Sequence, residues 1–275
     1  LSEKGREGKT LGTLSGIKVA SAMVASVVTF AGFRYELFSF RNPVIPFLLV
    51  AVTSVLGAGA MIYLCRYVKV PHRDSLPGKI KLRKEYRYYY ALAILNGVQK
   101  QIMIVFGPWV LVDLLGAGAD HMSLLVIMTS LLGMIFLPFI GRCIDSFGIR
   151  KILYADAFSF IFVYALYGML CSAIIAGSVS LKVGMILGGT MFIFDRMSMN
   201  LGMVRTMYLR NMAVDKNELT QTISLGISMD HVVAISCAML SGYIWSSVGP
   251  QYVFYFTAAL SVLNLLIAKT VEINE

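Results

Sequence analysis

Three polar side chains lie close together in an otherwise apolar stretch of the sequence. Asn96, Gln99 and Lys100 are spaced at i, i+3 and i+4, so they share one face if the segment is an α-helix. Two amides and an ammonium group offer several hydrogen-bond donors and acceptors to a polar molecule. We expect these three residues to contact a solute.

Two acidic residues lie in later apolar stretches. Asp195 precedes Arg196, and Asp230 precedes His231. Neighbours in a helix point about 100° apart, so Asp195 and Arg196 cannot simply pair. A carboxyl group in apolar surroundings can bind and release a proton near neutral pH. We therefore expect Asp195 or Asp230 to carry a coupling proton or to meet a positive charge of the solute, with Arg196 and His231 in the same site. The alternative is a static network in which Lys100 permanently pairs with an aspartate and only orders the helices.

Patterns of common enzymes and metal sites are absent from the sequence. It contains no HExxH and no GxSxG, and Gly116-Ala-Gly118 lacks the third glycine of a dinucleotide-binding loop. The three histidines are far apart, and the cysteines show no CxxC spacing (Cys65, Cys143, Cys171 and Cys237). We expect no catalytic residue, no metal and no cofactor, and hence not an enzyme.

The composition indicates which elements must position these residues. Hydrophobic residues make up 57% of the 275 and charged residues 14%, whereas a water-soluble domain carries roughly 25% charged residues. Apolar stretches close to the ~20 residues needed to cross a bilayer recur along the chain. The sequence predicts an all-α integral membrane protein with about eight transmembrane helices, at residues 11–32, 44–65, 89–114, 122–140, 151–176, 182–208, 219–245 and 250–270.

These helices bring the ionisable groups to one depth. At a rise of about 1.5 Å per residue, Lys100, Asp195 and Asp230 all lie near the midplane of a hydrocarbon core about 30 Å thick. A charged side chain there costs a few kcal/mol and is usually paired or functional. Pro108, directly after Gly107, is expected to kink the third helix.

Lysine and arginine are concentrated on one side of this topology. They crowd the connection between the second and third helices, at Arg66, Lys69, Arg73, Lys79, Lys81, Arg83, Lys84 and Arg87, whereas the opposite side has only Arg34, Arg41 and Lys182. The bias places the basic side, with both ends of the chain, in the cytoplasm. The net charge of +9 then indicates contact with anionic lipid headgroups rather than nucleic acid. Four tyrosines that close this connection are expected to form an interfacial belt: Tyr86, Tyr88, Tyr89 and Tyr90.

A charged turn, "GRCIDSFGIRK" at 141–151, separates the fourth and fifth helices. Its Gly141, Asp145, Gly148, Arg150 and Lys151 give the pattern G-x-x-x-D-x-x-G-x-R-K. This resembles the cytoplasmic loop between the second and third helices of a six-helix half in the major facilitator superfamily. The glycines allow a tight turn and close helix approach, and Asp145 can face a helix end or an arginine. We interpret the five residues as a conformational-switch loop.

The resemblance implies how the chain is organised. The family has twelve helices in two bundles joined by a long basic cytoplasmic loop, so this chain resembles helices five to twelve and its second six-helix half is complete. Residues 1–65 would be the last two helices of the N-terminal bundle, 66–90 the linker and 91–275 the C-terminal bundle. We expect the missing N-terminal helices of the same polypeptide to precede Leu1 and to be a partner of this part.

The resemblance also implies a function. The later half is similar to uncharacterised bacterial members of the family, which implies a secondary active transporter in the bacterial cytoplasmic (inner) membrane. It would move a small-molecule solute by alternating access, coupled to protons. The helices at 89–114 and 182–208 would line the cavity, and that at 219–245 would border it. The alternative is a non-transporting membrane sensor or scaffold with the same fold, and the substrate and direction are left open.

The charge bias predicts the orientation of the chain in the membrane. Ser75→Cys and Ser246→Cys, each in a background without other accessible thiols, should react with an impermeant thiol reagent from opposite sides. Ser246→Cys should label in intact cells, because its connection faces outward, and Ser75→Cys only after the cells are opened. Labelling of Ser75→Cys in intact cells would contradict the predicted topology.

Overall fold

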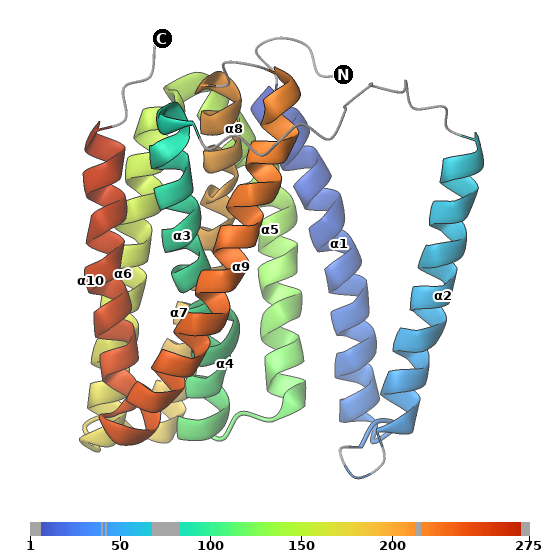
Figure 1. The fold of residues 1–275 in the computed structure, drawn as a ribbon. Helices are drawn as coiled ribbons and strands as arrows, with labels where there is room; N and C mark the ends of the chain where they lie inside the picture. The colour runs from blue at the N-terminus through green and yellow to red at the C-terminus, as the bar shows by residue number, and fades with distance from the viewer. Residues whose placement is uncertain (1–6, 40, 42, 68–82, 213–215, 271–275) are drawn as a thin grey trace.

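The computed structural model describes residues 7–39, 41, 43–67, 83–212 and 216–270. All secondary structure in these residues is helical (Figure 1). Most of the predicted linker 66–90 lies outside the described residues. The helices are α1 (Glu7–Arg34), α2 (Val44–Tyr67), η1 (Lys84–Tyr86), α3 (Arg87–Gln101), η2 (Ile102–Phe106), α4 (Gly107–Trp109), η3 (Val110–Leu114), α5 (Ala119–Phe147), α6 (Ile149–Ile175), α7 (Leu181–Leu201), α8 (Met203–Met212), α9 (Lys216–Ser247) and α10 (Pro250–Thr270).

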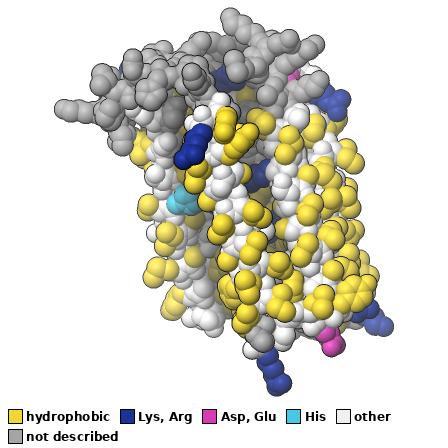
Figure 2. Space-filling view, turned by 90° about the vertical axis from the view of Figure 1, so that its right-hand side faces the viewer, with side chains coloured by type: hydrophobic (Ala, Val, Ile, Leu, Met, Phe, Trp, Pro, Cys, Tyr) yellow, Lys and Arg dark blue, Asp and Glu magenta, His cyan; other side chains and the backbone are white. Residues whose placement is uncertain are grey.

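Six of the described helices are long and apolar enough to cross a membrane: α1, α2, α5, α6, α9 and α10. Hydrophobic side chains cover most of the face in Figure 2, and the visible charged side chains gather mainly towards its two ends. The prediction of an all-α protein is confirmed for the described residues, and the six apolar helices support an integral membrane protein. The other two predicted spans, 89–114 and 182–208, are helical but are not among these six, so the count of eight spans remains a prediction.

The third predicted span is one helical path with two π-helical turns. The turns η2 and η3 flank the short α4, which begins with Gly107 and Pro108. Pro108 has no N–H, and its ring collides with the carbonyl four residues earlier in a regular helix. Turns with i→i+5 bonds accommodate such a residue, and they often occur at functional sites. The irregularity lies where the sequence predicts a kink.

The predicted turn at 141–151 is almost entirely helical, which corrects the prediction of a loop. Gly141 and Asp145 belong to α5, and Arg150 and Lys151 belong to α6. Gly148 alone links the two helices, with φ +81° and ψ 160°, a conformation that residues with a Cβ rarely adopt. One glycine in this conformation reverses the chain, so no longer loop is needed.

The residues around Gly148 differ in their surroundings. Gly141 is buried, whereas Asp145, Arg150 and Lys151 are exposed. The Arg150 guanidinium donates a hydrogen bond of 3.2 Å to the backbone carbonyl of Lys269 in the last turn of α10. A cation at the carbonyl end of a helix is favourable, so Arg150 ties the start of α6 to the end of α10.

Close packing of α1 against α5 depends on small residues. A Cβ at Gly12 would lie 2.6 Å from the backbone oxygen of Leu137, and one at Gly133 would lie 3.2 Å from the side chain of Val19. Glycines therefore let the two backbones approach. By contrast, α2 has no buried residue and stands apart from the other helices (Figure 1). The first predicted helix is thus part of the bundle, and the second is not.

The remaining helices enclose two apolar cores. One contains Tyr164, Tyr167 and Phe254, and the other contains Tyr86 and Tyr208. This corrects the predicted interfacial belt, because three of its four tyrosines are buried in the protein: Tyr86, Tyr89 and Tyr90. Aromatic residues after a basic segment resemble an interfacial anchor in the sequence, but here their helix faces α8 and α9.

The contact between α3 and α9 predicts a strict requirement for Gly97. A Cβ at this position would collide with the backbone oxygen of Asp230, so Gly97→Ala should destabilise the protein. Overpacking of this kind costs about 1–3 kcal/mol, against a gain of up to about 1 kcal/mol in helix propensity. Thermal unfolding of the purified protein in detergent measures the difference.

Gly242→Ala is the matched control. Nothing lies within 4 Å of a Cβ built at Gly242, so this variant should unfold at the wild-type temperature or slightly above it. A Gly97→Ala protein as stable as Gly242→Ala would contradict the packing described here.

Candidate functional site

Asp230 is held over the backbone of α3. Its peptide oxygen lies against Gly97, and its side chain reaches Asn96, directly before that glycine, and Lys100, one turn after it. One turn earlier on α9, Gly226 lies against Tyr89 of α3, where a Cβ would be 2.6 Å from the tyrosine oxygen. The two glycines, one on each helix, bring α3 and α9 close enough for short side chains to bridge them.

Asn96, Lys100 and Asp230 form one hydrogen-bonded group. The Asn96 amide donates to one carboxylate oxygen of Asp230 at 2.8 Å, and the Lys100 ammonium donates to the other at 2.5 Å. The Asp230 side chain is 9% exposed and the Lys100 side chain 24%. Because both oxygens are bonded and the charges balance, the group is compatible with a depth at which an isolated charge is costly.

Gln99 is directed towards other helices. Its amide nitrogen donates to the Ser261 hydroxyl of α10 at 3.0 Å, and its backbone carbonyl accepts a 2.8 Å bond from the Tyr164 hydroxyl of α6. Gln99 is 2% exposed. The three polar residues of α3 therefore do not share one neighbour, because α3 is surrounded by helices on several sides: Asn96 and Lys100 bond Asp230, and Gln99 does not. Gln99 joins α3 to α6 and α10 rather than to Asp230.

Asp195 lies in a second polar place. It is fully buried, and neither carboxylate oxygen has a hydrogen-bond partner among the described residues. Arg196 turns away and lies over the ring of Phe192 at 5.0 Å. Asp195 and Arg196 thus point apart, as their spacing predicts. The structure brings neither of them to Asp230.

His231 lies outside the polar group. It is exposed on α9, whereas the adjacent Asp230 is buried. Neighbouring residues on a helix face different directions, and only one of this pair faces α3. Among the described residues, no group of three or more His, Cys, Asp or Glu could hold a metal ion.

A cavity of about 160 Å³ lies beside the Asn96–Asp230 pair. Its walls come from α3, the junction of α7 and α8, and α9, and its lining residues are Tyr89, Ala93, Asn96, Gly202, Arg205, Thr206, Ile223, Gly226, Ile227 and Asp230. The lining combines a carboxylate, a guanidinium, an amide and hydroxyl groups with apolar surface. Such a mixture is typical of sites for small polar molecules.

Sequence reasoning missed Arg205. It forms a buried ion pair with Asp156 of α6 at 2.9 Å, in which the two side chains are 8% and 2% exposed. Asp156 appears in the sequence only as an acidic residue near a helix end, and Arg205 only as one of several basic residues at the cytoplasmic side. Nothing in their spacing pairs them, because they lie on different helices. The pair fixes one wall of the cavity.

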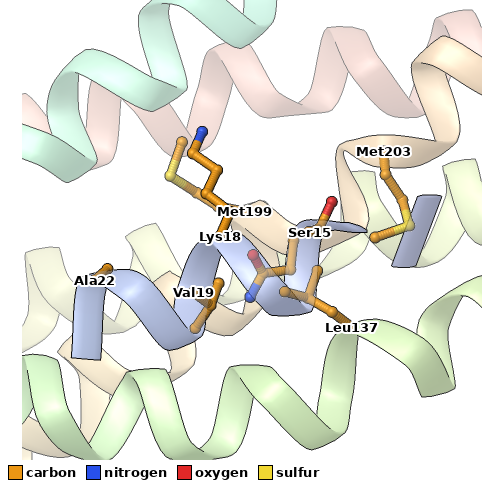
Figure 3. Close-up of a pocket in the computed structure, with 8 residues that line it drawn as sticks. Ser15, Lys18, Val19, Ala22, Leu137, Met199 and Met203 are labelled. Carbon is orange, nitrogen blue, oxygen red and sulfur yellow. The ribbon is translucent and has the colours of Figure 1, made fainter. Parts of the chain in front are cut away.

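A second cavity, of about 300 Å³, lies where α1 meets α5, α7 and α8 (Figure 3). Lys18 of α1 extends beside Met199 of α7, on the side of α1 away from Leu137. The lining residues are Ser15, Lys18, Val19, Ala22, Leu137, Met199, Asn200 and Met203. The described residues offer Lys18 no acidic partner. We refer to this space as the α1 cavity.

Comparison with models of known protein families and with curated proteins gives no match.

The Lys100–Asp230 pair predicts a measurable coupling. Lys100→Met should destabilise the protein by a few kcal/mol, since it leaves a buried carboxylate without its counter-charge; removing one partner of a buried pair costs about 3–5 kcal/mol. Combining it with Asp230→Asn should cost less than the two single changes together, by at least about 1 kcal/mol. Chemical denaturation in detergent gives the three free energies.

Lys182→Met is the control for loss of a lysine. Lys182 is exposed at the start of α7, so its loss should leave the free energy of unfolding within about 0.5 kcal/mol of wild type. Strict additivity of Lys100→Met and Asp230→Asn would contradict an energetic link between the two side chains.

Proposed function

We propose that this chain is part of a secondary active transporter of the major facilitator type. It would move a small solute across the bacterial cytoplasmic membrane by alternating access, coupled to protons. Two features support the proposal: the resemblance of residues 141–151 to the family's cytoplasmic loop, and the polar residues that α3, α7 and α9 carry inside an apolar bundle. The chain would supply the last two helices of one bundle and the whole of the other.

The observation that carries the proposal is the cavity beside Asn96 and Asp230. Its polar side chains come from helices far apart in the sequence, and Lys100 borders the same group through its bond to Asp230. Ionisable residues inside a membrane are rare, and they mark solute and proton pathways when they border a space. A purely structural pair has no need of a cavity beside it.

Opening of the Lys100–Asp230 pair would admit the solute. With the pair open, the Lys100 ammonium, the Asn96 amide and the Asp230 carboxylate would each be able to bind a polar or charged group of the solute. Proton binding at a second buried carboxyl group would be linked to this step, because such linkage is reciprocal. Asn96, Lys100 and Asp230 are therefore the proposed solute contacts, with Gln99 holding α3 against its neighbours.

Alternating access requires that two groups of helices move against each other. The contact between α1 and α5 crosses the predicted boundary between the bundles, and the α1 cavity lies along it. Helices that meet through small residues can slide with little loss of side-chain packing. Lys18 and Asn200 would then lie on opposite walls of the path by which the solute leaves or enters.

The alternative is a sensor or scaffold in which Lys100 and Asp230 remain permanently paired. A closed ion pair is expected under that alternative as well, so the bond itself does not separate the two. The two alternatives differ in whether the Lys100–Asp230 pair must open for the protein to function. A static pair can be replaced by neutral groups of similar size without loss of function, whereas a pair that opens during transport cannot.

Transport by the full-length gene product in proteoliposomes tests the proposal. After a flux screen has identified a solute, the Lys100→Met/Asp230→Asn double variant should fold and insert but lose solute-driven proton movement by at least about tenfold. The matched control is Lys182→Met/Asp113→Asn, because both of these residues are exposed. It removes one positive and one negative charge and should transport normally.

Two results would contradict the proposal. Wild-type transport by the Lys100→Met/Asp230→Asn variant would show that the pair is only structural. Absence of flux for every solute, with correctly folded wild-type protein, would favour the sensor or scaffold.

A further inference from the structure

Two buried oxygen-bearing side chains, one on α6 and one on α7, lie near Gly107 without hydrogen-bond partners among the described residues. Asp195 and Tyr167 are both 0% exposed. The two carboxylate oxygens of Asp195 and the hydroxyl of Tyr167 have no hydrogen-bond partner among the described residues. Buried polar groups are nearly always bonded, and each exception needs an explanation. Here three such atoms belong to two side chains that both lie near Gly107.

Gly107 provides the point at which they meet. A Cβ at this residue would lie 3.3 Å from an oxygen of Asp195 and 3.6 Å from the Tyr167 hydroxyl. Both oxygens therefore border the space that a side chain at position 107 would fill. Gly107 begins the short α4 between the two π-helical turns. The most irregular part of the third span thus covers the carboxyl group.

Few charges surround this carboxyl group. Tyr164 and Tyr167 of α6 and Arg196 of α7 are the titratable groups that interact with it, and α4 contributes Gly107. The Tyr164 hydroxyl is already engaged with the Gln99 carbonyl, and Arg196 lies over Phe192. An ionised carboxylate without a partner in such a place costs several kcal/mol. Asp230, by contrast, has a lysine and an amide on its two oxygens.

We propose that Asp195 and Tyr167 form an occluded proton site, with Gly107 as the space through which the proton enters and leaves. The carboxylate takes a proton from water and becomes a neutral acid that needs no counter-ion. When the proton returns to water, the Tyr167 hydroxyl moves to within hydrogen-bond distance of the carboxylate and donates to it, while keeping its own proton. Asp195 carries the proton, and Tyr167 is a positioning residue that stabilises the ionised form.

The assignment of this site as the coupling site rests on the proposed function. The proton site itself does not, because proton binding can be measured without transport. The sequence leaves open which of Asp195 and Asp230 carries the proton and which meets a positive charge. The proposal assigns the proton to Asp195, and it leaves Asp230 ion-paired with Lys100 beside the cavity.

Infrared difference spectra of the full chain in detergent, between acidic and alkaline buffer, test the site through the carbonyl band of protonated carboxyl groups. Wild type should show a band that disappears at a pH well above that of an exposed aspartate and that is absent from Asp195→Asn. The matched control Asp113→Asn alters an exposed aspartate and should retain the band. Tyr167→Phe should retain it to a pH about one unit higher, a tenfold rise in proton affinity, because the ionised form has lost its donor.

Gly107→Ala should act in the same direction as Tyr167→Phe, since its methyl group fills the space between the two oxygens. Gly242→Ala, where nothing lies within 4 Å, should leave the band unchanged. A band that survives in Asp195→Asn, or a midpoint that Tyr167→Phe does not move, would overturn the proposal. So would loss of the band on adding Na⁺, but not choline, at constant pH, since the site would then take a metal ion.

If the spectra behave as expected and no solute produces flux, the site stands and the transporter proposal fails. If flux is found and the Asp195 band is absent, the transporter stands and coupling belongs to another residue.

Discussion

Asp230 imposes the constraint on which the rest of the site depends. Its peptide oxygen lies against Gly97, while its carboxylate reaches Asn96 and Lys100 on the same helix. This arrangement requires a residue without a side chain at 97 and a charge partner one turn further on. Because the buried Asp230 carboxylate bonds two residues only one turn apart on α3, it fixes the register of α9 along α3. The cavity beside Asn96 has its shape because the two helices meet in this register.

The two aspartates at similar predicted depth have opposite surroundings. Both oxygens of Asp230 are bonded, one to an ammonium group, and its charge is therefore stabilised in place. Asp195 is fully buried and has no hydrogen-bond partner among the described residues, so an ionised carboxylate there has a high free-energy cost. Environments that separate two carboxyl groups in this way give them different roles in proton chemistry. The difference arises from packing. Asp230 of α9 contacts Lys100 of α3, whereas Asp195 of α7 lies against the irregular turns around Gly107.

Several features could be predicted from the sequence because they depend on residue type and period alone. Apolar length predicted the membrane helices, and the order Gly107–Pro108 predicted irregularity in the third span. Features that depend on which helices become neighbours could not be predicted. By its spacing Gln99 shares a helical face with Asn96, but in the structure it donates a hydrogen bond to Ser261 of α10. The Arg205–Asp156 ion pair likewise joins α8 to α6. Gly148 shows a third limit, because its charged neighbours suggested a loop where two helices nearly join. The functional assignments of Asn96, Lys100, Asp195 and Asp230 remain predictions.

Access to the cavity from each side of the membrane is the most direct test of the account. Ala93 lines the cavity and is 8% exposed, and Ala93→Cys adds a small thiol there without touching the bonds of Asp230. In a variant of the protein that lacks the native cysteines, we expect a small impermeant thiol reagent to label this position from either side of the membrane, in right-side-out and in inverted vesicles. A static bundle would expose it to one side at most. Labelling from one side only, or from neither, would contradict a cavity that opens alternately.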